Sequence, residues 1–258
     1  MSQLGRFLEL SVRSTDLLES LAFYKALGFC ELTIGDAWSH RYAVVSDGEL
    51  CIGLHDREHE SPALTFVHPD VAQHARGMID HGFELAYLHV DRDEFNRLGF
   101  TDPDGHMITI QEARTFSPPV DELDHSLCGE WFEITLPVKD ATHTGRFWAP
   151  LAPVLLRMRE EPTLHMRFDA AGVALGLSES IALAAPSLCF KCHDREALLA
   201  AIERHGMRHK PFPGFEGAFV EIVAPEGTRL YAFDQDFLGE PYIVEESGVY
   251  EAGDAFDP

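Results

Sequence analysis

Short runs in which apolar and polar residues alternate are separated by segments in which apolar residues recur every three or four positions. Alternation is typical of a half-buried β-strand, and the longer spacing is typical of an amphipathic helix. The first group opens with the strand pattern Phe7–Val12, and a helix follows from the N-cap candidate Asp16 to Gly28. Three further strands are predicted at Phe29–Ile34, His40–Ser46 and Glu49–His55. The order is β-α-β-β-β, with Asp47-Gly48 as the last hairpin turn.

The same order recurs three more times. The second unit has a strand at Ala63–Val67, a helix from Asp70 to Ile79, and strands at Glu84–Val90, Arg97–Thr101 and His106–Gln111. The third has a strand at Trp131–Leu136, a helix from Thr142 to Trp148, and strands at Val154–Arg159, His165–Asp169 and Val173–Leu177. The fourth has Ser187–Cys192, a helix from Asp194 to His205, and strands at Ala218–Val223 and Arg229–Phe233. The chain is therefore predicted to be an α+β protein of four βαβββ units.

The two halves of the chain repeat each other at a nearly constant spacing. Glu9 and Glu133 are 124 positions apart, and so are Phe23 and Phe147. A period this long indicates a duplicated module rather than the shorter repeat of a solenoid. A charged segment with adjacent prolines separates the halves, so we predict a first module over 1–114, a linker over 115–125 and a second module over 126–240. Residues 241–258 are acidic and are expected to form a weakly ordered tail.

The charge of the chain argues against two classes of partner. Lysine and arginine number 20 against 43 aspartates and glutamates, which gives a formal charge of −23. Nucleic acids and anionic membrane surfaces are bound through basic side chains, so neither is expected as a partner. We find no apolar run of about 20 residues, and therefore predict no transmembrane helix. The N-terminus leads straight into a strand without the layout of a signal peptide, so a cytoplasmic location is expected.

The five cysteines do not suggest a disulfide framework. Their number is odd, and most lie in apolar strand patterns, so we expect buried free thiols in a reducing compartment. Cys189 and Cys192 form a C-x-x-C motif. No second pair accompanies them, so a zinc site is not predicted there.

Two motifs resemble the signatures of a known superfamily. The first is the strand followed by Asp16, Ser20, Phe23-Tyr24 and Leu27-Gly28-Phe29, and the second is the turn Asp102-Pro103-Asp104-Gly105 with His106-Met107-Ile108. Both are similar to those of the vicinal oxygen chelate superfamily, which includes glyoxalase I, bleomycin-resistance proteins, fosfomycin-resistance enzymes and extradiol dioxygenases. The resemblance implies two tandem glyoxalase-like modules whose mixed sheets form cups. Because this fold serves many chemistries, it does not by itself identify a function.

The resemblance also implies where a metal would be held. In the superfamily, inward-facing His, Glu or Gln side chains on the first and last strands of each unit bind a divalent metal. The matching positions here hold Glu9, Gly53, Ala63 and Thr109 in the first half, and Glu133, Gly176, Ser187 and Tyr231 in the second. A divalent ion needs three or four convergent donors, and neither half supplies more than one or two. We therefore predict that the family metal site is lost, with a divalent metal held by other residues as the alternative.

Glu9 and Glu133 are the strongest candidates for a functional role. A carboxylate inside an apolar strand must be hydrogen bonded, paired with a cation or directed into a solvated cavity. Here such a carboxylate occurs twice, at equivalent positions. One interpretation is a charge partner or general base for a ligand. The other is an ancestral carboxylate that an arginine or the backbone now satisfies.

Five further residues are expected to line the cups. Tyr231 is grouped with the two glutamates as a catalytic candidate, because its hydroxyl can donate a hydrogen bond to a ligand oxygen. Thr109 can do the same. The remaining ligand-binding candidates are His55, Ser187 and Trp38.

Three functions are consistent with these residues. The preferred one is a protein that binds a small organic molecule in a cup without metal, as bleomycin-resistance relatives do, with an acidic cavity suited to a cationic ligand. The second is a metal-dependent lyase, isomerase or extradiol-type dioxygenase. The third is a metal-free enzyme in which Glu9 or Glu133 is the general base. The identity of the ligand, the number of cavities and the formation of a homodimer stay open.

Overall fold

The computed structural model of the protein describes residues 3–34, 40–90, 96–112, 125–160, 163–210 and 218–234. Two units in this part form the first module. Their elements are β1 (Arg6–Arg13), α1 (Leu17–Ala26), β2 (Cys30–Leu32), β3 (Tyr42–Ser46), β4 (Cys51–His55), β5 (Ala63–His68), α2 (Val71–Asp80), β6 (Tyr87–His89), β7 (Arg97–Thr101) and β8 (Met107–Glu112).

Two more units form the second module. Their elements are β9 (Glu130–Pro137), α3 (Ala141–Trp148), β10 (Val154–Arg159), β11 (His165–Asp169), β12 (Ala174–Ser178), β13 (Ser187–Cys192), α4 (Arg195–His205), β14 (His209–Lys210), β15 (Phe219–Val223) and β16 (Arg229–Asp234). The predicted α+β class with four βαβββ units in two similar modules is confirmed. The predicted linker and tail lie outside the described residues, apart from His125.

The edge strands are where prediction and structure differ. The predicted strands Phe29–Ile34 and Glu84–Val90 shorten to β2 and β6, and the two-residue β14 had no counterpart in the sequence pattern. These three strands lie at the ends of their sheets and pair with one neighbour only. The alternation of apolar and polar residues continues past the last residue that pairs with the neighbouring strand. The pattern alone therefore predicts an edge strand that is too long.

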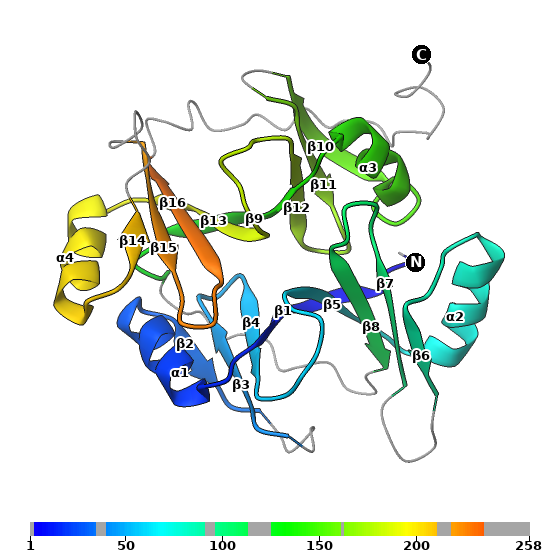
Figure 1. Ribbon diagram of the computed structural model, residues 1–258, viewed down its shortest axis with the longest axis horizontal. Coiled ribbons are helices and arrows are strands. Elements are labelled where there is room, and N and C mark those ends of the chain that lie inside the picture. Colours follow the sequence, from blue (N-terminus) through cyan, green and yellow to red (C-terminus); the bar gives the residue numbers. More distant parts are fainter. Residues whose placement is uncertain are drawn as a thin grey trace.

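Each module is one eight-stranded mixed sheet. The order is β2-β3-β4-β1-β5-β8-β7-β6 in the first sheet and β10-β11-β12-β9-β13-β16-β15-β14 in the second. The first strands of the two units, β1 with β5 and β9 with β13, pair antiparallel at the centre. In Figure 1 the outer strands of each module extend to the same side of this central pair, so each sheet is U-shaped, and the two sheets open in opposite directions.

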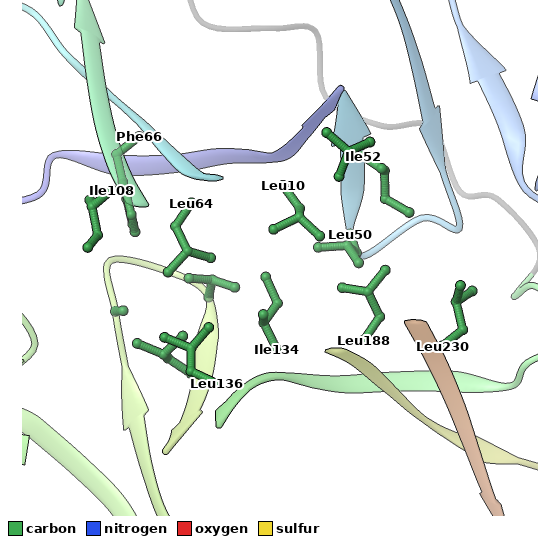
Figure 2. Close-up of a cluster of buried hydrophobic side chains, with 14 of the residues drawn as sticks. Leu10, Leu50, Ile52, Leu64, Phe66, Ile108, Ile134, Leu136, Leu188 and Leu230 are labelled. Atoms are coloured by element: carbon green, nitrogen blue, oxygen red, sulfur yellow. The ribbon is translucent and has the colours of Figure 1, made fainter. Parts of the chain in front are cut away.

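The core lies between the two central strand pairs. Leu10 of β1 and Ile134 of β9 are buried at equivalent positions, and Leu64 and Leu188 follow from β5 and β13. Figure 2 shows these side chains directed toward one another from the two modules. Because side chains alternate across a strand, the odd-numbered neighbours of Leu10 face away from this core. The inner surface of each sheet, hereafter the first cup and the second cup, is therefore a separate face, and the two cups lie on opposite sides of the molecule.

The four helices begin in the same way. Asp16, Asp70, Asp140 and Asp194 are their N-caps, and each carboxylate accepts a hydrogen bond from the backbone N–H three residues on. The cap satisfies a donor that the first helical turn leaves open. The aspartate predicted at this point is thus a structural feature of every unit. None of the helices in the described part of the chain is both long and apolar enough to cross a bilayer.

The remaining residues of the two motifs join the modules. At one junction Asp104, in the turn between β7 and β8, accepts a hydrogen bond from Thr144 of α3 at 2.6 Å. At the other, Glu226 of the turn between β15 and β16 accepts from Ser20 at 2.8 Å and from Tyr24 at 2.6 Å, both on α1. The turn of each module therefore contacts the first helix of the other. The motifs that carry the resemblance hold the fold together and lie away from the cups.

Candidate functional site

The two repeated glutamates occupy the centres of the two cups. Glu9 is 2% exposed and Glu133 is 4% exposed. Each lies on the first strand of its module, next to a β-bulge, with its side chain on the face opposite the core. A carboxylate buried to this degree needs partners, and the partners differ between the two cups.

Two hydroxyls and a histidine surround Glu9 in the first cup. The Ser11 hydroxyl donates to Oε1 at 2.7 Å, and the Tyr42 hydroxyl donates to Oε2. His55 Nε2 lies 2.9 Å from Oε1. Thr65, across from Glu9 on β5, contacts the Ser11 hydroxyl at 2.7 Å. The Glu9 carboxylate is therefore held from three sides by side chains of β1, β3 and β4.

The charge state of Glu9 fixes the protons of its neighbours. Burial raises the pKa of Glu9, but hydrogen bonding and charge from His55 and the hydroxyls of Tyr42 and Ser11 outweigh it, so the net pKa lies below its usual value. Burial and the adjacent carboxylate raise the pKa of Tyr42 well above its usual value. Glu9 is thus an ionised acceptor and Tyr42 a protonated donor. His55 must then carry a proton on Nε2.

A second histidine extends this network toward solvent. His40 Nε2 lies 3.0 Å from His55 Nδ1. Burial, followed by the neighbouring His55, lowers the pKa of His40 from its usual 6.5 to about 4. Burial also lowers the pKa of His59, whose ring lies 5.3 Å from that of His55. Two of the imidazole rings in the first cup, those of His40 and His59, therefore favour the neutral form.

A glycine makes room for each glutamate. A side chain at Gly53 would overlap the Glu9 carboxylate, and a Cβ at Gly176 would lie 2.7 Å from Glu133 Oε1. At both glycines the added Cβ would lie closer to the glutamate than van der Waals contact allows. Gly53 and Gly176, matched to metal-ligand positions in the resemblance, are therefore sites of close packing against the glutamates.

A hydroxyl, a histidine and an arginine surround Glu133 in the second cup. The Thr135 hydroxyl donates to Oε1 at 2.6 Å, in the role of Ser11. His165 Nε2 lies 3.2 Å and 3.3 Å from the two carboxylate oxygens, and Arg167 Nε lies 3.7 Å from Oε2. Burial raises the pKa of Glu133, but His165, Thr135 and Arg167 outweigh it, so the net pKa lies below its usual value. Glu133 is an ionised carboxylate between two basic side chains.

An aromatic floor lies beside this network. Cys189, Phe219 and Tyr231 form a buried cluster separate from the main core, with Phe132 and Phe233 packed against it. The Arg167 guanidinium lies 5.8 Å from the centre of the Phe132 ring. Burial raises the pKa of the Cys189 thiol, so this cysteine is an apolar part of the floor rather than a nucleophile.

Arg229 and Glu221 form a second ion pair, on the side of the aromatic cluster away from Glu133. Arg229 donates to Glu221, and both flank Tyr231 on β15 and β16. Burial and the Glu221 carboxylate raise the pKa of Tyr231 to about 12. Tyr231, predicted as a catalytic candidate, therefore stays protonated, next to an arginine and among apolar side chains.

The structure places the other predicted residues as follows. His55 joins the Glu9 network, as its expected position in the first cup requires. Thr109 faces the same cup and its hydroxyl contacts that of Tyr87 at 2.9 Å. Ser187 donates to Ala185 O at 2.8 Å and makes no hydrogen bond to Glu133 in the described part of the structure. Ala63 pairs with Ser11 rather than Glu9. Trp38 lies outside the described residues.

The pairing register of the strands explains why Ala63 and Ser187 do not face the glutamates as predicted. Thr65 and Cys189, two residues beyond Ala63 and Ser187, lie across from Glu9 and Glu133. A shift of two keeps a side chain on the same face, so alternation cannot detect it. Arg167 was also missed, because a charged residue in an alternating strand reads as solvent-exposed. Its position two residues after His165, on the same face, was the available signal.

The residues of the cups do not fit the metal of the superfamily. At the matched positions of the second half, Glu133 is engaged by Thr135 and His165, Ser187 by the backbone, and Tyr231 stays protonated. Across the described ranges, no three His, Cys, Asp or Glu side chains converge in a way that could hold an ion. The donor set therefore gives no basis for a metal-dependent step.

A third concave region lies away from both glutamates. It is an open cleft of about 470 Å³ where the end of α2 and the β7–β8 turn meet α3. Phe83, Phe100 and Phe147 contact one another in its wall. None of the predicted site residues lines it.

Comparisons with known proteins give structural neighbours but no sequence relatives. No protein-family model matches the chain, and no curated protein matches it. A catechol 2,3-dioxygenase superposes with a TM-score of 0.57 at 11% identity, covering 90% of this chain and 88% of that one. The 2,3-dioxygenase LapB from Pseudomonas sp. KL28 gives 0.57 at 14%, covering 89% and 91%. A mutant homoprotocatechuate 2,3-dioxygenase from Brevibacterium fuscum gives 0.60 at 15%, covering 93% and 74%.

Identities this low establish the fold and leave the activity open. The neighbours are extradiol dioxygenases, which belong to the vicinal oxygen chelate superfamily named by the sequence resemblance. The chain has the two-module α+β fold of the extradiol dioxygenases.

Proposed function

We propose that the protein binds a small organic molecule in the second cup without the metal of the superfamily. The observation that carries this proposal is the combination of an aromatic floor with arginine side chains on one sheet face. Phe132, Phe233 and Tyr231 offer apolar surface, and Arg167 and Arg229 lie at its two sides. A mainly apolar surface with a few polar groups in fixed positions is typical of a small-molecule site.

The first cup is less suited to a ligand. Glu9, Ser11, Thr65 and His55 are all buried, and their polar atoms bond to one another. A ligand would have to displace these internal hydrogen bonds. The Tyr231 cluster, in contrast, has half-buried Phe132 and Phe233 at its rim.

General-base catalysis by the glutamates receives little support. The net pKa values of Glu9 and Glu133 lie below the usual value, and their oxygens already accept hydrogen bonds. An effective general base has a pKa near the working pH and a lone pair directed at the substrate. We therefore assign both glutamates to positioning the side chains around them.

The fold of the neighbours agrees with a ligand of this size. The names of two of them refer to catechol and homoprotocatechuate. The ligand of this chain is proposed to be a similarly small molecule, bound by a cytoplasmic protein that uses neither nucleic acid nor membrane as a partner. A homodimer is compatible with this proposal and is not part of it.

The test is binding of neutral aromatic probes to the full chain. We expect saturation-transfer NMR to detect benzamide and indole equally with and without a metal chelator. Phe132→Ala is expected to weaken both, because it removes part of the floor. The matched control is Tyr87→Ala in the first cup, which is expected to leave binding unchanged.

Two results would overturn the proposal. One is a stoichiometric metal in the purified protein whose removal abolishes binding. The other is loss of binding in Tyr87→Ala with retention in Phe132→Ala, which would move the ligand to the first cup.

A further inference from the structure

The cleft between the end of α2, the β7–β8 turn and α3 has an aromatic wall. These three segments lie on the same side of the molecule in Figure 1. The volume of the cleft, about 470 Å³, falls within the roughly 300–1,000 Å³ of small-molecule sites. The ring centres of Phe83 and Phe147 lie 5.6 Å apart, and Phe100 lies 5.8 Å and 6.2 Å from them. Phe100 is fully buried, whereas Phe83 and Phe147 are half-buried, so parts of these two rings face the cleft.

The equivalent junction of the duplicated chain shows that the fold does not require this wall. There the β15–β16 turn contacts α1, and the positions that match the three phenylalanines hold Met207, Ile222 and Phe23. Phe23 is 9% exposed, whereas Phe147 at the matching position of α3 is half-buried. Apolar surface left in water forgoes the stabilisation that burial would give. A cluster of three aromatic rings that stays open in one copy only therefore points to a ligand rather than to packing.

The charges of the lining nearly cancel. The carboxylate of Asp102 is already engaged, because its Oδ1 accepts from the backbone N–H groups of Asp104 and His106 and its Oδ2 lies 2.8 Å from His106 Nδ1. Besides one histidine, the other ionisable side chains of the lining are Arg146 and Glu84, which carry opposite charges. A neutral ligand therefore suits the cleft better than an ion does.

The histidine of the lining, His81, places a hydrogen-bond acceptor at the α2 end of the cleft. Its Nδ1 lies 2.7 Å from the carbonyl oxygen of Gly77, four residues earlier. A carbonyl oxygen only accepts, so Nδ1 carries the proton, and Nε2 of the neutral ring is an acceptor. The His81 side chain is exposed and lines the cleft, and the exposed carboxylate of Glu84 adds a second acceptor. This end of the cleft therefore accepts hydrogen bonds.

We infer that this cleft is a second binding site, for a neutral, flat aromatic molecule that carries an N–H or O–H donor at its edge. The rings of Phe83 and Phe147 pack against the apolar body of the ligand, and His81 Nε2 accepts from its donor. The cleft shares no residue with the aromatic floor of the second cup, so the inference does not depend on the proposed function.

The experiment compares benzimidazole with benzoxazole at pH 8, where both are neutral. The two probes have nearly the same shape and share a ring nitrogen that accepts, but benzoxazole has an oxygen in place of the N–H group. Backbone amide shifts of the isotope-labelled full chain locate each probe, and their titration gives its dissociation constant. We expect shifts at Gly82, Phe83 and Thr101, with benzimidazole bound about fivefold more tightly, as for one neutral hydrogen bond.

Replacing the histidine tests the assigned acceptor. His81→Phe keeps a flat ring but removes Nε2, so it is expected to abolish the preference for benzimidazole while leaving the affinity for benzoxazole unchanged. A merely structural role of His81 would weaken both probes equally. The matched control is His205→Phe, because His205 is exposed at the equivalent end of α4, and it is expected to leave the preference intact.

A second variant tests the location of the site without removing its aromatic wall. Thr101 is exposed at the end of β7 and lines the cleft, so Thr101→Trp is expected to fill the cleft and to abolish the shifts caused by both probes. Thr15→Trp adds the same side chain at an exposed position outside the cleft and is expected to change nothing. The amide spectra also show whether each variant is folded.

Four results would overturn the inference. They are the absence of shifts in the cleft with either probe, equal affinities for the two probes, shifts that Thr101→Trp leaves unchanged, and shifts at the same amides that depend on protein concentration without a probe. The last result would assign the cleft to a contact between two copies of the chain. None of them bears on the second cup, whose test is Phe132→Ala, so the two proposals fail independently.

Discussion

The first and second cups share a glutamate, a hydroxyl two residues later and a glycine beneath the carboxylate, yet the remaining partners of the carboxylate differ. Glu9 is held by the neutral donors Ser11 and Tyr42 and by His55. Glu133 is held by Thr135, His165 and a guanidinium. The difference shows that duplication preserved the buried charge while each copy changed its surroundings. The first cup closes its carboxylate into hydrogen bonds with two hydroxyls and a histidine, whereas the second cup adds a guanidinium.

The largest effect is expected from removing the buried charge. Glu9→Gln places amide hydrogens against the donors Ser11 and Tyr42, which leaves buried groups unsatisfied. We expect a loss of about 3 kcal/mol in the free energy of unfolding, measured by urea denaturation. Glu133→Gln is expected to lose about 1 kcal/mol, because His165 and Arg167 are partly exposed and can turn to water. Equal losses would contradict the distinction between the cups.

Filling the space beneath each glutamate is expected to have the next largest effect. Gly53→Ala would displace the Glu9 carboxylate from its three donors, with an expected loss of about 2 kcal/mol. Gly176→Ala meets a less crowded Glu133 and is expected to lose about 1 kcal/mol.

Gly77→Ala in α2 is the matched control for both glycine variants. An added Cβ meets nothing within 4 Å there, so this variant is expected to be neutral or slightly stabilising. A Gly53→Ala protein as stable as this control would show that Glu9 can move freely.

A smaller effect is expected from one hydroxyl. Tyr42→Phe removes a donor to Glu9 but keeps the ring, which packs 4.4 Å from that of His55. A loss of about 1.5 kcal/mol is expected from calorimetry or denaturant titration, since a hydrogen bond to a charged group is removed. Thr135→Val is the corresponding change in the second cup, and a loss below about 1 kcal/mol is expected because two basic side chains remain on Glu133.

The sequence predicts the positions of the two glutamates better than it predicts the side chains around them. The spacing of the repeat located both glutamates, and the resemblance to the superfamily placed them at positions that face the cups. Of the partners of Glu9, His55 was predicted in the first cup, but Tyr42 was not, because it reaches Glu9 from a strand more than 30 positions away in sequence. A register shift of two residues, which moved the contact from Ala63 to Thr65, leaves the polarity pattern unchanged. The motifs Asp16–Ser20 and Asp102–Gly105 proved informative about the fold because they form helix caps and module junctions.

The smallest effect is expected in the pH dependence of the free energy of unfolding, through His40 of the first cup. The folded-state pKa of His40 is about 4, below its usual 6.5, because burial and the neighbours His55, Arg57 and His59 disfavour its charged form more than Asp56 favours it. Between these values the unfolded chain binds a proton that the folded chain does not, so stability is lost as the pH falls from about 6.5 to 4. Removing this histidine should therefore flatten the curve of stability against pH.

His40→Gln tests this expectation through urea midpoints at pH 8, 6.5 and 5. At pH 8 the imidazole is neutral in both states, so the comparison there measures any loss of packing alone. The fall in midpoint between pH 6.5 and 5 is expected to be smaller in the variant, by a modest amount because His40 is partly exposed and solvent screens it. The fall of the urea midpoint with pH should become smaller without disappearing. Burial also lowers the pKa of His59, so that histidine also destabilises the folded chain as the pH falls. The lowered pKa of Glu9 also works in this direction, but only below its usual value of 4.5, outside the measured range. Parallel curves for the two proteins would mean that His40 is as solvated in the folded chain as in the unfolded one, and the first cup would then be more open than its hydrogen bonds indicate.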